Sequence, residues 1–525
     1  MMLNIRRAEI LTPLIVIIVG ASAALYLYSV DNFSLLYYGD SISHLVAGRK
    51  FVDWVNPGIA QIGTVWLPML HFLLIPFSLN NFLFTSGLAG MFVSLPALGL
   101  ASLYIVKLIY RWNGSVRIAF FGGLVFALNP SIIYMGVVSM QESLLLFFAL
   151  ASMYYIYSWF DDSQKKSRGG LKSLYISAPL IILATLTRYE AWLLPLALTI
   201  LVIIRLVSSK DLKIFSRYLP PLLLSFGGIA LWLGWNQLSY GDPLTFLNTP
   251  FYSYLAQATS RPFREFLFLQ PVSSAQVLFM AMEVMYGAPL LILSAIGTIR
   301  FIGKSRRQIS QRFIFIILLG LPTISTYIAL VAGFGELFHQ GGGIWFNSRF
   351  LVLTSGVVTF GAVSLLTLTK RRTYLFAISF ILILSVGFGS VRQLGYPNPP
   401  MVMKEAYAGF SYRNETFSAL GIANILETEY QGGTILMLTS SGDAQKIMVF
   451  TGIPLRNYRD LFGGDPWPFK DGRRTFTDWT IVSNQPSGDA LLGVGYLQQN
   501  SVILNKNYDI VASNSFFTLL RLKTG

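Results

Sequence analysis

Long apolar segments separated by short polar ones occupy residues 1–390 of the chain. A helix needs about 20 apolar residues to cross a bilayer, and about eleven segments approach or reach this length. Inside the hydrocarbon layer a single segment satisfies its backbone hydrogen bonds only as a helix. The pattern therefore predicts an all-α polytopic bundle of about eleven transmembrane helices. These helices are expected at residues 9–29, 83–109, 118–138, 143–160, 173–189, 191–208, 218–239, 276–300, 313–333, 350–369 and 373–390.

One apolar segment is too short to be counted among them. Residues 64–79, TVWLPMLHFLLIPFSL, contain two prolines and His71. A run of this length is typical of a re-entrant or interfacial helix. If it crossed the membrane, the basic residues around Arg111 and Lys165 would lie on the opposite side from the other basic loops. We therefore expect a re-entrant or juxtamembrane helix at this position.

The alternation of long apolar and short polar segments ends after Val391. A polar stretch rich in proline and glycine follows, and then come apolar runs that read as strands: GTILMLTSS, KIMVFTGIPL, WTIVSN and DIVASNSFFTLLRL. We predict a small α/β or α+β domain here. The chain would then have two domains, a transmembrane domain at residues 1–390 and a soluble domain at residues 391–525.

Composition and charge fit a membrane protein. The 525 residues are 54% hydrophobic and 12% charged, with a mean hydropathy of +0.58, which excludes a soluble globular protein of this size. The net charge of +15 falls in short clusters between apolar segments, so it indicates cytoplasmic loops rather than nucleic-acid binding. An odd number of crossings then gives a cytoplasmic N-terminus and an extracytoplasmic C-terminal domain. The absence of cysteine excludes disulfides, thiolate nucleophiles and cysteine-bound metals.

Polar and ionisable residues gather at the predicted helix ends that lie away from the basic clusters. Such groups cost several kcal/mol near the membrane unless they are paired or line a wet cavity, so they are candidates for function. We expect them to surround an outward-facing cavity and to bind substrate or catalyse a reaction. The candidates are Asp40, His44, His71, Glu142, Arg188, Glu190, His339, Asn347 and Arg349.

The residue types in this group indicate glycosyl transfer from a lipid phosphate. In YYGDSISHLVAGRKF a helix starting at Asp40 would place His44 one turn later on the same face, and the carboxylate could act as a general base. Glu142 could hold a substrate hydroxyl or share a divalent cation. Arg188 and Arg349 carry planar guanidinium groups that suit a phosphate. An acceptor hydroxyl would lose its proton, attack the anomeric carbon and expel a phosphate that arginine stabilises.

The order of these motifs resembles the GT-C glycosyltransferases that use polyprenyl-phosphate sugars, including protein O-mannosyltransferases and the lipid A aminoarabinose transferases. The resemblance covers about residues 1–390 and includes LNPSIIYMGVVSMQESLLLFF and WNQLSYGDPLTF. It implies Asp40 as the catalytic base, Glu142 as the second acid and Arg349 as the late arginine. It also implies a monosaccharide donor (mannose-like, or another hexose or pentose) and a lipid, glycan or protein acceptor. The chain lacks the paired acids of several relatives, which leaves a metal requirement open.

Most of these candidates also have a purely structural alternative. Asp40 could merely cap the following helix, because Asp is a preferred N-cap residue. His44 and His71 could be hydrogen-bonded packing residues. Arg188 could form an interfacial ion pair with Glu190.

Two other functions compete with glycosyl transfer. A secondary transporter or lipid flippase would use acids near the middle of the membrane, and Glu283 is the one candidate of this kind. A non-catalytic scaffold would leave the polar group at the outer helix ends unexplained. As a structural alternative to phosphate binding, Arg349 could anchor the end of its helix.

Overall fold

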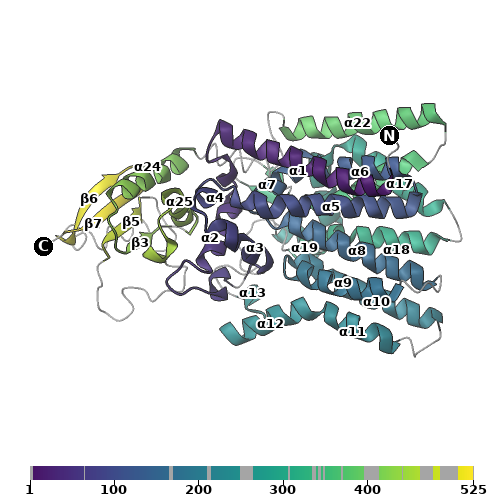
Figure 1. Cartoon of the computed structure of the whole chain (residues 1–525), viewed down its shortest axis with the longest axis horizontal. Helices are drawn as coiled ribbons and strands as arrows, with labels where there is room; N and C mark the ends of the chain where they lie inside the picture. The colour runs from purple at the N-terminus through teal and green to yellow at the C-terminus, as the bar shows by residue number, and fades with distance from the viewer. Residues whose placement is uncertain are drawn as a thin grey trace. The chain divides into compact units, whose positions relative to one another are not determined.

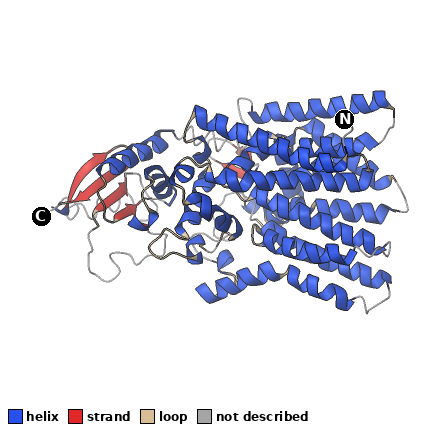
Figure 2. Cartoon of the chain, viewed as in Figure 1, coloured by secondary structure: helices blue, strands red, loops and turns tan. Residues whose placement is uncertain are grey.

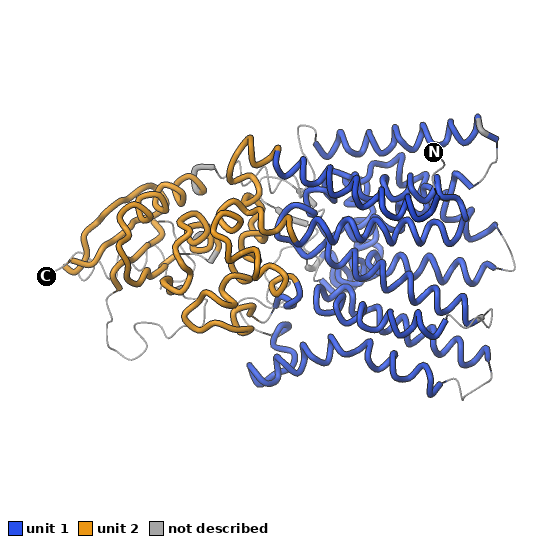
Figure 3. The backbone as a smooth tube through the Cα atoms, viewed as in Figure 1, with its two compact units in different colours: residues 1–25, 64–69, 93–404 blue, residues 26–63, 70–92, 405–525 orange. Residues whose placement is uncertain are grey.

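The computed structural model describes most of the chain in two compact units (Figure 3). Unit 1 comprises residues 1–25, 64–69 and 93–404, and unit 2 comprises residues 26–63, 70–92 and 405–525. Unit 2 therefore joins the first loop to the C-terminal part of the chain. The structure describes residues 4–63, 65–164, 170–209, 215–248, 264–304, 308–333, 338–340, 344–346, 349–367, 371–394, 413–439, 441–460, 477–484 and 506–523.

Unit 1 is a bundle of apolar helices (Figures 1 and 2). In the described part of the chain five helices are long and apolar enough to cross a membrane, and up to nine spans result if each bent pair of helices counts as one. With the shorter apolar helices α9 and α21, they occupy every predicted segment, which confirms the multi-pass membrane bundle. The helices are α1 (Ile5–Val30), α5 (Ala89–Asn113), α6 (Val116–Ala127), α7 (Pro130–Val137), α8 (Glu142–Gln164), α9 (Gly170–Thr185), η3 (Tyr189–Trp192), α10 (Leu193–Ser209), α11 (Phe215–Ser225), α12 (Gly227–Tyr240), α13 (Thr245–Asn248), α15 (Arg264–Leu267), α16 (Pro271–Tyr286), α17 (Ala288–Gly303), α18 (Ile309–Leu319), α19 (Leu321–Val331), α20 (Arg349–Val352), α21 (Ser355–Ser364), η6 (Leu365–Thr367) and α22 (Arg372–Leu394).

Several predicted spans are bent rather than straight. The largest bend, 112°, separates α16 from α17, where Gly287 has φ of 78° and a proline follows at the start of α17. A positive φ suits glycine, and proline has no N–H to continue the helix, so the predicted span at residues 276–300 is formed by two helices. A bend of 69° separates α6 from α7, where the side chain of Asn129 accepts a hydrogen bond from the Ser131 N–H.

Among the described residues, the crossing of α17 and α21 is the clearest case of helix packing that depends on glycine. A Cβ atom at Gly297 of α17 would lie 1.9 Å from the carbonyl oxygen of Gly361 in α21. Only hydrogen fits there, so the two backbones come into contact as small residues allow in membrane helices.

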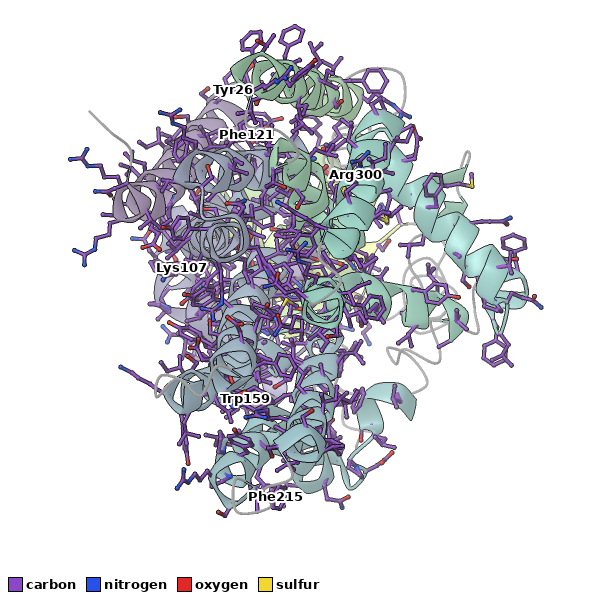
Figure 4. The ribbon with its side chains drawn as sticks, turned by 90° about the vertical axis from the view of Figure 1, so that its right-hand side faces the viewer. Tyr26, Lys107, Phe121, Trp159, Phe215 and Arg300 are labelled. Atoms are coloured by element: carbon purple, nitrogen blue, oxygen red, sulfur yellow. The ribbon has the colours of Figure 1, made fainter. Side chains whose placement is uncertain are left out.

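The basic clusters meet at one end of unit 1, the end that faces the viewer in Figure 4. Arg111 at the end of α5 forms ion pairs with Asp161 and Asp162 at the end of α8, at 2.8 and 3.1 Å. Arg205 of α10 donates to the Ser163 carbonyl at 2.8 Å. Arg312 of α18 donates to a carbonyl near the end of α17 at 2.7 Å. These bonds join the ends of α5, α8 and α10 and, separately, those of α17 and α18.

Unit 2 is an α/β structure, as the sequence predicts for its C-terminal part. Its five-stranded sheet has the order β4-β3-β5-β7-β6, in which β3 is parallel to β4 and β5 and the remaining pairs are antiparallel. The run KIMVFTGIPL, predicted as a strand, lies largely in helix α25, because its apolar residues are buried against α2, α24 and the sheet. The elements are η1 (Ser34–Leu36), α2 (Gly39–Lys50), η2 (Ile59–Ile62), α3 (Met69–Ser78), α4 (Asn81–Thr85), α24 (Arg413–Glu429), β3 (Ile435–Leu438), α25 (Ser441–Thr451), η7 (Leu455–Asn457), β4 (Tyr458–Asp460), β5 (Trp479–Ser483), β6 (Tyr508–Ser513) and β7 (Phe517–Leu522).

Candidate functional site

Three of the predicted site residues form one ion-pair cluster in unit 1. Arg188 Nη1 lies 2.8 Å from Glu142 Oε1, and Arg188 Nη2 lies 2.8 Å from Glu190 Oε1. Arg188 Nε also donates to both oxygens of Glu190 at 3.2 Å. One guanidinium group therefore holds two carboxylates that come from different helices.

Glu142 is the most buried member of this cluster. It is the first residue of α8, its side chain is fully buried, and a carboxylate is favoured at the start of a helix by the helix dipole. Glu142 Oε2 is buried and has no hydrogen-bond partner among the described residues. An unsatisfied carboxylate oxygen in a buried position is costly, so Glu142 keeps acceptor capacity that its contact with Arg188 does not use.

A set of aromatic contacts fixes the loop that carries Arg188. Arg188 has extended backbone angles (φ −151°, ψ 150°) just before η3. The next residue, Tyr189, donates to the Val65 carbonyl at 2.9 Å and accepts from the Trp232 indole N–H at 3.1 Å. The Tyr189 ring also stacks on Phe246 with centroids 5.0 Å apart. These contacts hold the backbone next to Arg188. They could not be predicted from the sequence, because aromatic residues are common in apolar segments and form no motif there.

The two predicted phosphate-binding arginines lie at the same aromatic ring. The guanidinium carbons of Arg349 and Arg188 lie 4.9 and 5.3 Å from the centroid of Phe350. Burial alone would lower the pKa of Arg188, but the carboxylates of Glu190 and Glu142 outweigh it and raise the pKa above its ordinary value, against an opposing contribution from Arg349. The two guanidinium groups thus lie close together around Phe350, a residue that no sequence pattern marks.

The cluster and the basic end of unit 1 lie at opposite ends of α8. Glu142 begins this helix, and Asp161, which pairs with Arg111, lies near its other end. At about 1.5 Å per residue the stretch between them is about 30 Å long, the thickness of the hydrocarbon core of a bilayer. The two groups of charges are therefore separated by one membrane thickness.

Unit 2 contains the remaining described candidates. Asp40 is partly exposed and lies in the first turn of α2, whose N-cap residue is Tyr38. The alternative in which Asp40 caps a helix starting at Ser41 is therefore wrong, because α2 begins at Gly39 and its N-cap lies two residues before Asp40. His44 and His71 are both buried, with His44 Nδ1 3.0 Å from His71 Nε2. This pairing fits the packing alternative, and substrate binding by the two histidines stays a prediction.

Two predicted substrate-binding residues fall at the edge of the described structure. His339 lies in β1 (Phe338–Gln340), opposite Trp345 of the antiparallel β2 (Ile344–Phe346), and its side chain is outside the described residues. Asn347 lies outside the described residues altogether. Across the described side chains, no group of three or more His, Asp or Glu is arranged to hold a metal ion. A role for a divalent cation stays a prediction.

Glu283, the acid that favoured a transporter, is paired. It lies in α16 and forms an ion pair with Arg392 of α22, whose Nη2 is 3.4 Å from Glu283 Oε2. Both side chains are about one third exposed, and α16 ends three residues later at the 112° bend. Arg392 lies two residues before the end of α22, so Glu283 is a paired acid at that helix end and not an isolated acid in the middle of a span.

Comparisons with known proteins identify solved structures with a similar chain path. No protein-family model matches the chain, and no curated protein matches it. The crystal structure of ArnT from Cupriavidus metallidurans bound to undecaprenyl phosphate aligns over 96% of this chain and 97% of its own, with 12% identity and a TM-score of 0.54. The archaeal oligosaccharyltransferase AglB from Archaeoglobus fulgidus, in complex with an inhibitory peptide and a dolichol-phosphate, aligns over 90% of this chain and 69% of its own, with 12% identity and a TM-score of 0.45. At this identity the likeness to ArnT concerns the fold.

Proposed function

Because the chain has the fold of the GT-C glycosyltransferases, we propose that it is an integral-membrane glycosyltransferase. It transfers a monosaccharide, mannose-like or another hexose or pentose, from a polyprenyl-phosphate donor to an acceptor hydroxyl. The undecaprenyl phosphate bound to ArnT supports this class of donor. The acceptor is a lipid, a glycan or a protein.

The observation that carries the proposal is the position of the two arginines beside the buried carboxylate. A phosphate leaving group develops negative charge as the glycosidic bond breaks, and guanidinium groups stabilise that charge. Arg188 and Arg349 share the ring of Phe350, and Arg188 also holds Glu142. Phosphate and sugar hydroxyls thus have binding groups within one cluster.

The residues of the Arg188 cluster receive their proposed roles from their contacts, and Asp40 receives its role from the resemblance. Arg349 and Arg188 bind the donor phosphate, and Glu142 Oε2 accepts a hydrogen bond from a substrate hydroxyl. Glu190 holds Arg188 in place. Asp40 takes the proton from the acceptor as general base, a role that rests on the resemblance in the first external loop.

The topology follows from the charge distribution. The basic end of unit 1 lies in the cytoplasm, which places the N-terminus there and the C-terminal domain outside. The Arg188 cluster, one membrane thickness away, then lies at the outer face. An outward site has no access to cytosolic nucleotide sugars, which supports a lipid-linked donor.

The pairing of Glu283 with Arg392 weighs against the transporter. A transporter needs an ionisable group that can bind a coupling ion or substrate near the middle of the membrane. Glu283 already has a cationic partner, Arg392, which lies two residues before the end of α22.

Reconstitution tests the proposal. The purified protein in liposomes is given radiolabelled undecaprenyl- and dolichyl-phosphate monosaccharides together with lipid, glycan and peptide acceptors. We expect transfer of label to one acceptor class and release of polyprenyl phosphate. A deletion strain whose lipid-linked sugars and glycoconjugates match those of the parent by mass spectrometry, together with no transfer in vitro from any donor, would refute it.

A further inference from the structure

Helix α2, which carries Asp40, is a short helix whose position depends on its neighbours. It has 12 residues, a length at which an isolated helix is marginal in water. Within unit 2 its apolar side chains Ile42, Leu45 and Val46 belong to the same hydrophobic cluster as residues of α24, α25 and the sheet. The C-terminal part of the chain therefore supplies part of the apolar surface on which α2 packs.

Hydrogen bonds also connect α2 to α25 and to α3. Ser43 donates to Gln445 of α25, and the neighbouring His44 forms its hydrogen bond with His71 of α3. A Cβ atom at Gly48 would lie 3.0 Å from the Cβ of Leu74, so α2 and α3 are also in close backbone contact. The helix is thus fixed between α3 and α25.

Asp53 closes this arrangement at the C-terminal end of α2. Its Oδ2 accepts from Arg49 Nε at 3.0 Å and from the backbone N–H of Leu455, the first residue of η7, also at 3.0 Å. Arg49 is buried, and its guanidinium carbon lies 4.5 Å from the centroid of Phe84. One carboxylate oxygen therefore joins the end of α2 to a segment 402 residues further along the chain.

We propose that the C-terminal domain positions the catalytic base, and that Asp53 is the positioning residue that couples the domain to α2. The inference rests on the proposed function, because it takes Asp40 as the base. Asp53 itself does not touch substrate. It keeps α2 seated on α25 and η7, and a misplacement of about 1 Å in a catalytic group can cost on the order of 100-fold in rate.

The inference predicts a specific kinetic change for Asp53 variants. Asp53→Ala removes the acceptor for both donors, and Asp53→Asn keeps an oxygen for the Leu455 N–H but loses the charge that pairs with Arg49. We expect kcat to fall by roughly 10- to 100-fold in Asp53→Ala and by less in Asp53→Asn. The KM for the donor should stay within about twofold, because the proposed donor-binding arginines belong to unit 1. Asp509→Asn, which removes only an exposed ion pair at 3.9 Å in β6, is the matched control and should leave kcat unchanged.

The rate of amide hydrogen exchange reports how firmly α2 is packed, and it needs no activity assay. Exchange of residues 39–50 should become faster in Asp53→Ala, whereas exchange in α8 should be unchanged. The chain has no cysteine, so a Ser43→Cys/Gln445→Cys pair linked by a short bismaleimide ties α2 to α25 at one defined place. In the Asp53→Ala background this link should restore slow exchange and most of kcat.

The results separate this inference from the proposed function. Unchanged exchange of α2 in both Asp53 variants overturns the inference, and so does faster exchange with normal kcat. A link that the parent protein tolerates but that does not restore kcat also overturns it. If Asp53→Ala fails to fold, Asp53→Asn and the linked protein give the same comparison. If the parent protein transfers no sugar, the proposed function fails, and exchange alone decides whether Asp53 holds α2.

Discussion

Arg188 donates to Glu142 across 2.8 Å and so ties the loop after α9 to the first residue of α8. The sequence predicts different roles for the two residues, phosphate binding for Arg188 and a catalytic role for Glu142. Because the two side chains are in contact, a substitution that removes one of them also affects the other. Removing Glu142 alters the position of Arg188, and removing Arg188 leaves a fully buried carboxylate without its cation.

The first prediction concerns the unpartnered oxygen of Glu142. Glu142→Gln keeps an oxygen for Arg188 but removes the charge that a substrate hydroxyl would meet. We expect transfer to fall by roughly 10- to 100-fold, the value of one hydrogen bond to a charged group of about 1.5–3 kcal/mol. Steady-state kinetics with purified protein in liposomes measure this.

Glu190→Gln is the matched control for Glu142. Both carboxylates bind Arg188, but both oxygens of Glu190 are already used by that arginine. Its substitution should weaken donor binding more than it lowers kcat. Equal effects of the two substitutions on kcat and KM would show that Glu142 only holds Arg188.

The second prediction concerns the arginines at Phe350. Arg349→Lys keeps the positive charge but loses the planar pair of N–H groups, so we expect weaker binding of undecaprenyl phosphate with little change in the melting temperature. Arg188→Lys should behave in the same way, with an added loss of stability from its two carboxylates. Phe350→Leu removes the ring that both cations face, an interaction of about 0.5–1 kcal/mol each at exposed sites and more when desolvated.

Calorimetric titration with undecaprenyl phosphate in detergent checks the arginine variants. Affinity that is unchanged in Arg349→Lys and Arg188→Lys would show that the arginines only anchor their helix ends. Arg217→Lys, at an exposed position near the start of α11, is a control that should bind like the parent protein.

The third prediction concerns sidedness. If the basic end of unit 1 is cytoplasmic, a reporter fused after Gly525 should be active outside, and one fused at Lys166 should be active inside. The proteolytic accessibility of both fusions in intact cells gives a second measurement. A cytoplasmic C-terminus would place the Arg188 cluster on the side that has nucleotide sugars and would remove the reason for a lipid-linked donor.

Much of the fold could be predicted from apolar segment length alone, because a crossing requires a fixed number of apolar residues. The bend at Gly287 could not, since hydropathy averages over the glycine and the proline that break the helix. The pattern of KIMVFTGIPL does not separate the two possibilities, because a short apolar run is compatible with a strand and with a buried helix. In the structure the apolar side chains of this run are buried against α2 and α24 as part of a helix.

The site was predictable in its charged members only. Arg188, Glu142 and Glu190 stand out because ionisable groups at the ends of membrane helices are costly. Their contact joins residues 46 positions apart, which depends on how α8 and α9 pack. Phe350 and Tyr189 carry no such signal, because aromatic residues are common in apolar segments. The attachment of α2 to the C-terminal domain through Asp53 is likewise a product of tertiary packing.

Asp40→Asn is the most direct test of the mechanism. Asparagine keeps the shape of the side chain but cannot take a proton, and general-base catalysis contributes on the order of 100- to 10,000-fold. Asp40 lies in the first turn of α2, where losing the charge should cost only about 0.3–1 kcal/mol. Single-turnover transfer from a labelled polyprenyl-phosphate sugar, measured beside melting temperature and donor affinity, decides the question. Our account predicts a folded protein that binds donor normally and transfers at least about 100-fold more slowly; near-normal transfer by Asp40→Asn would contradict it.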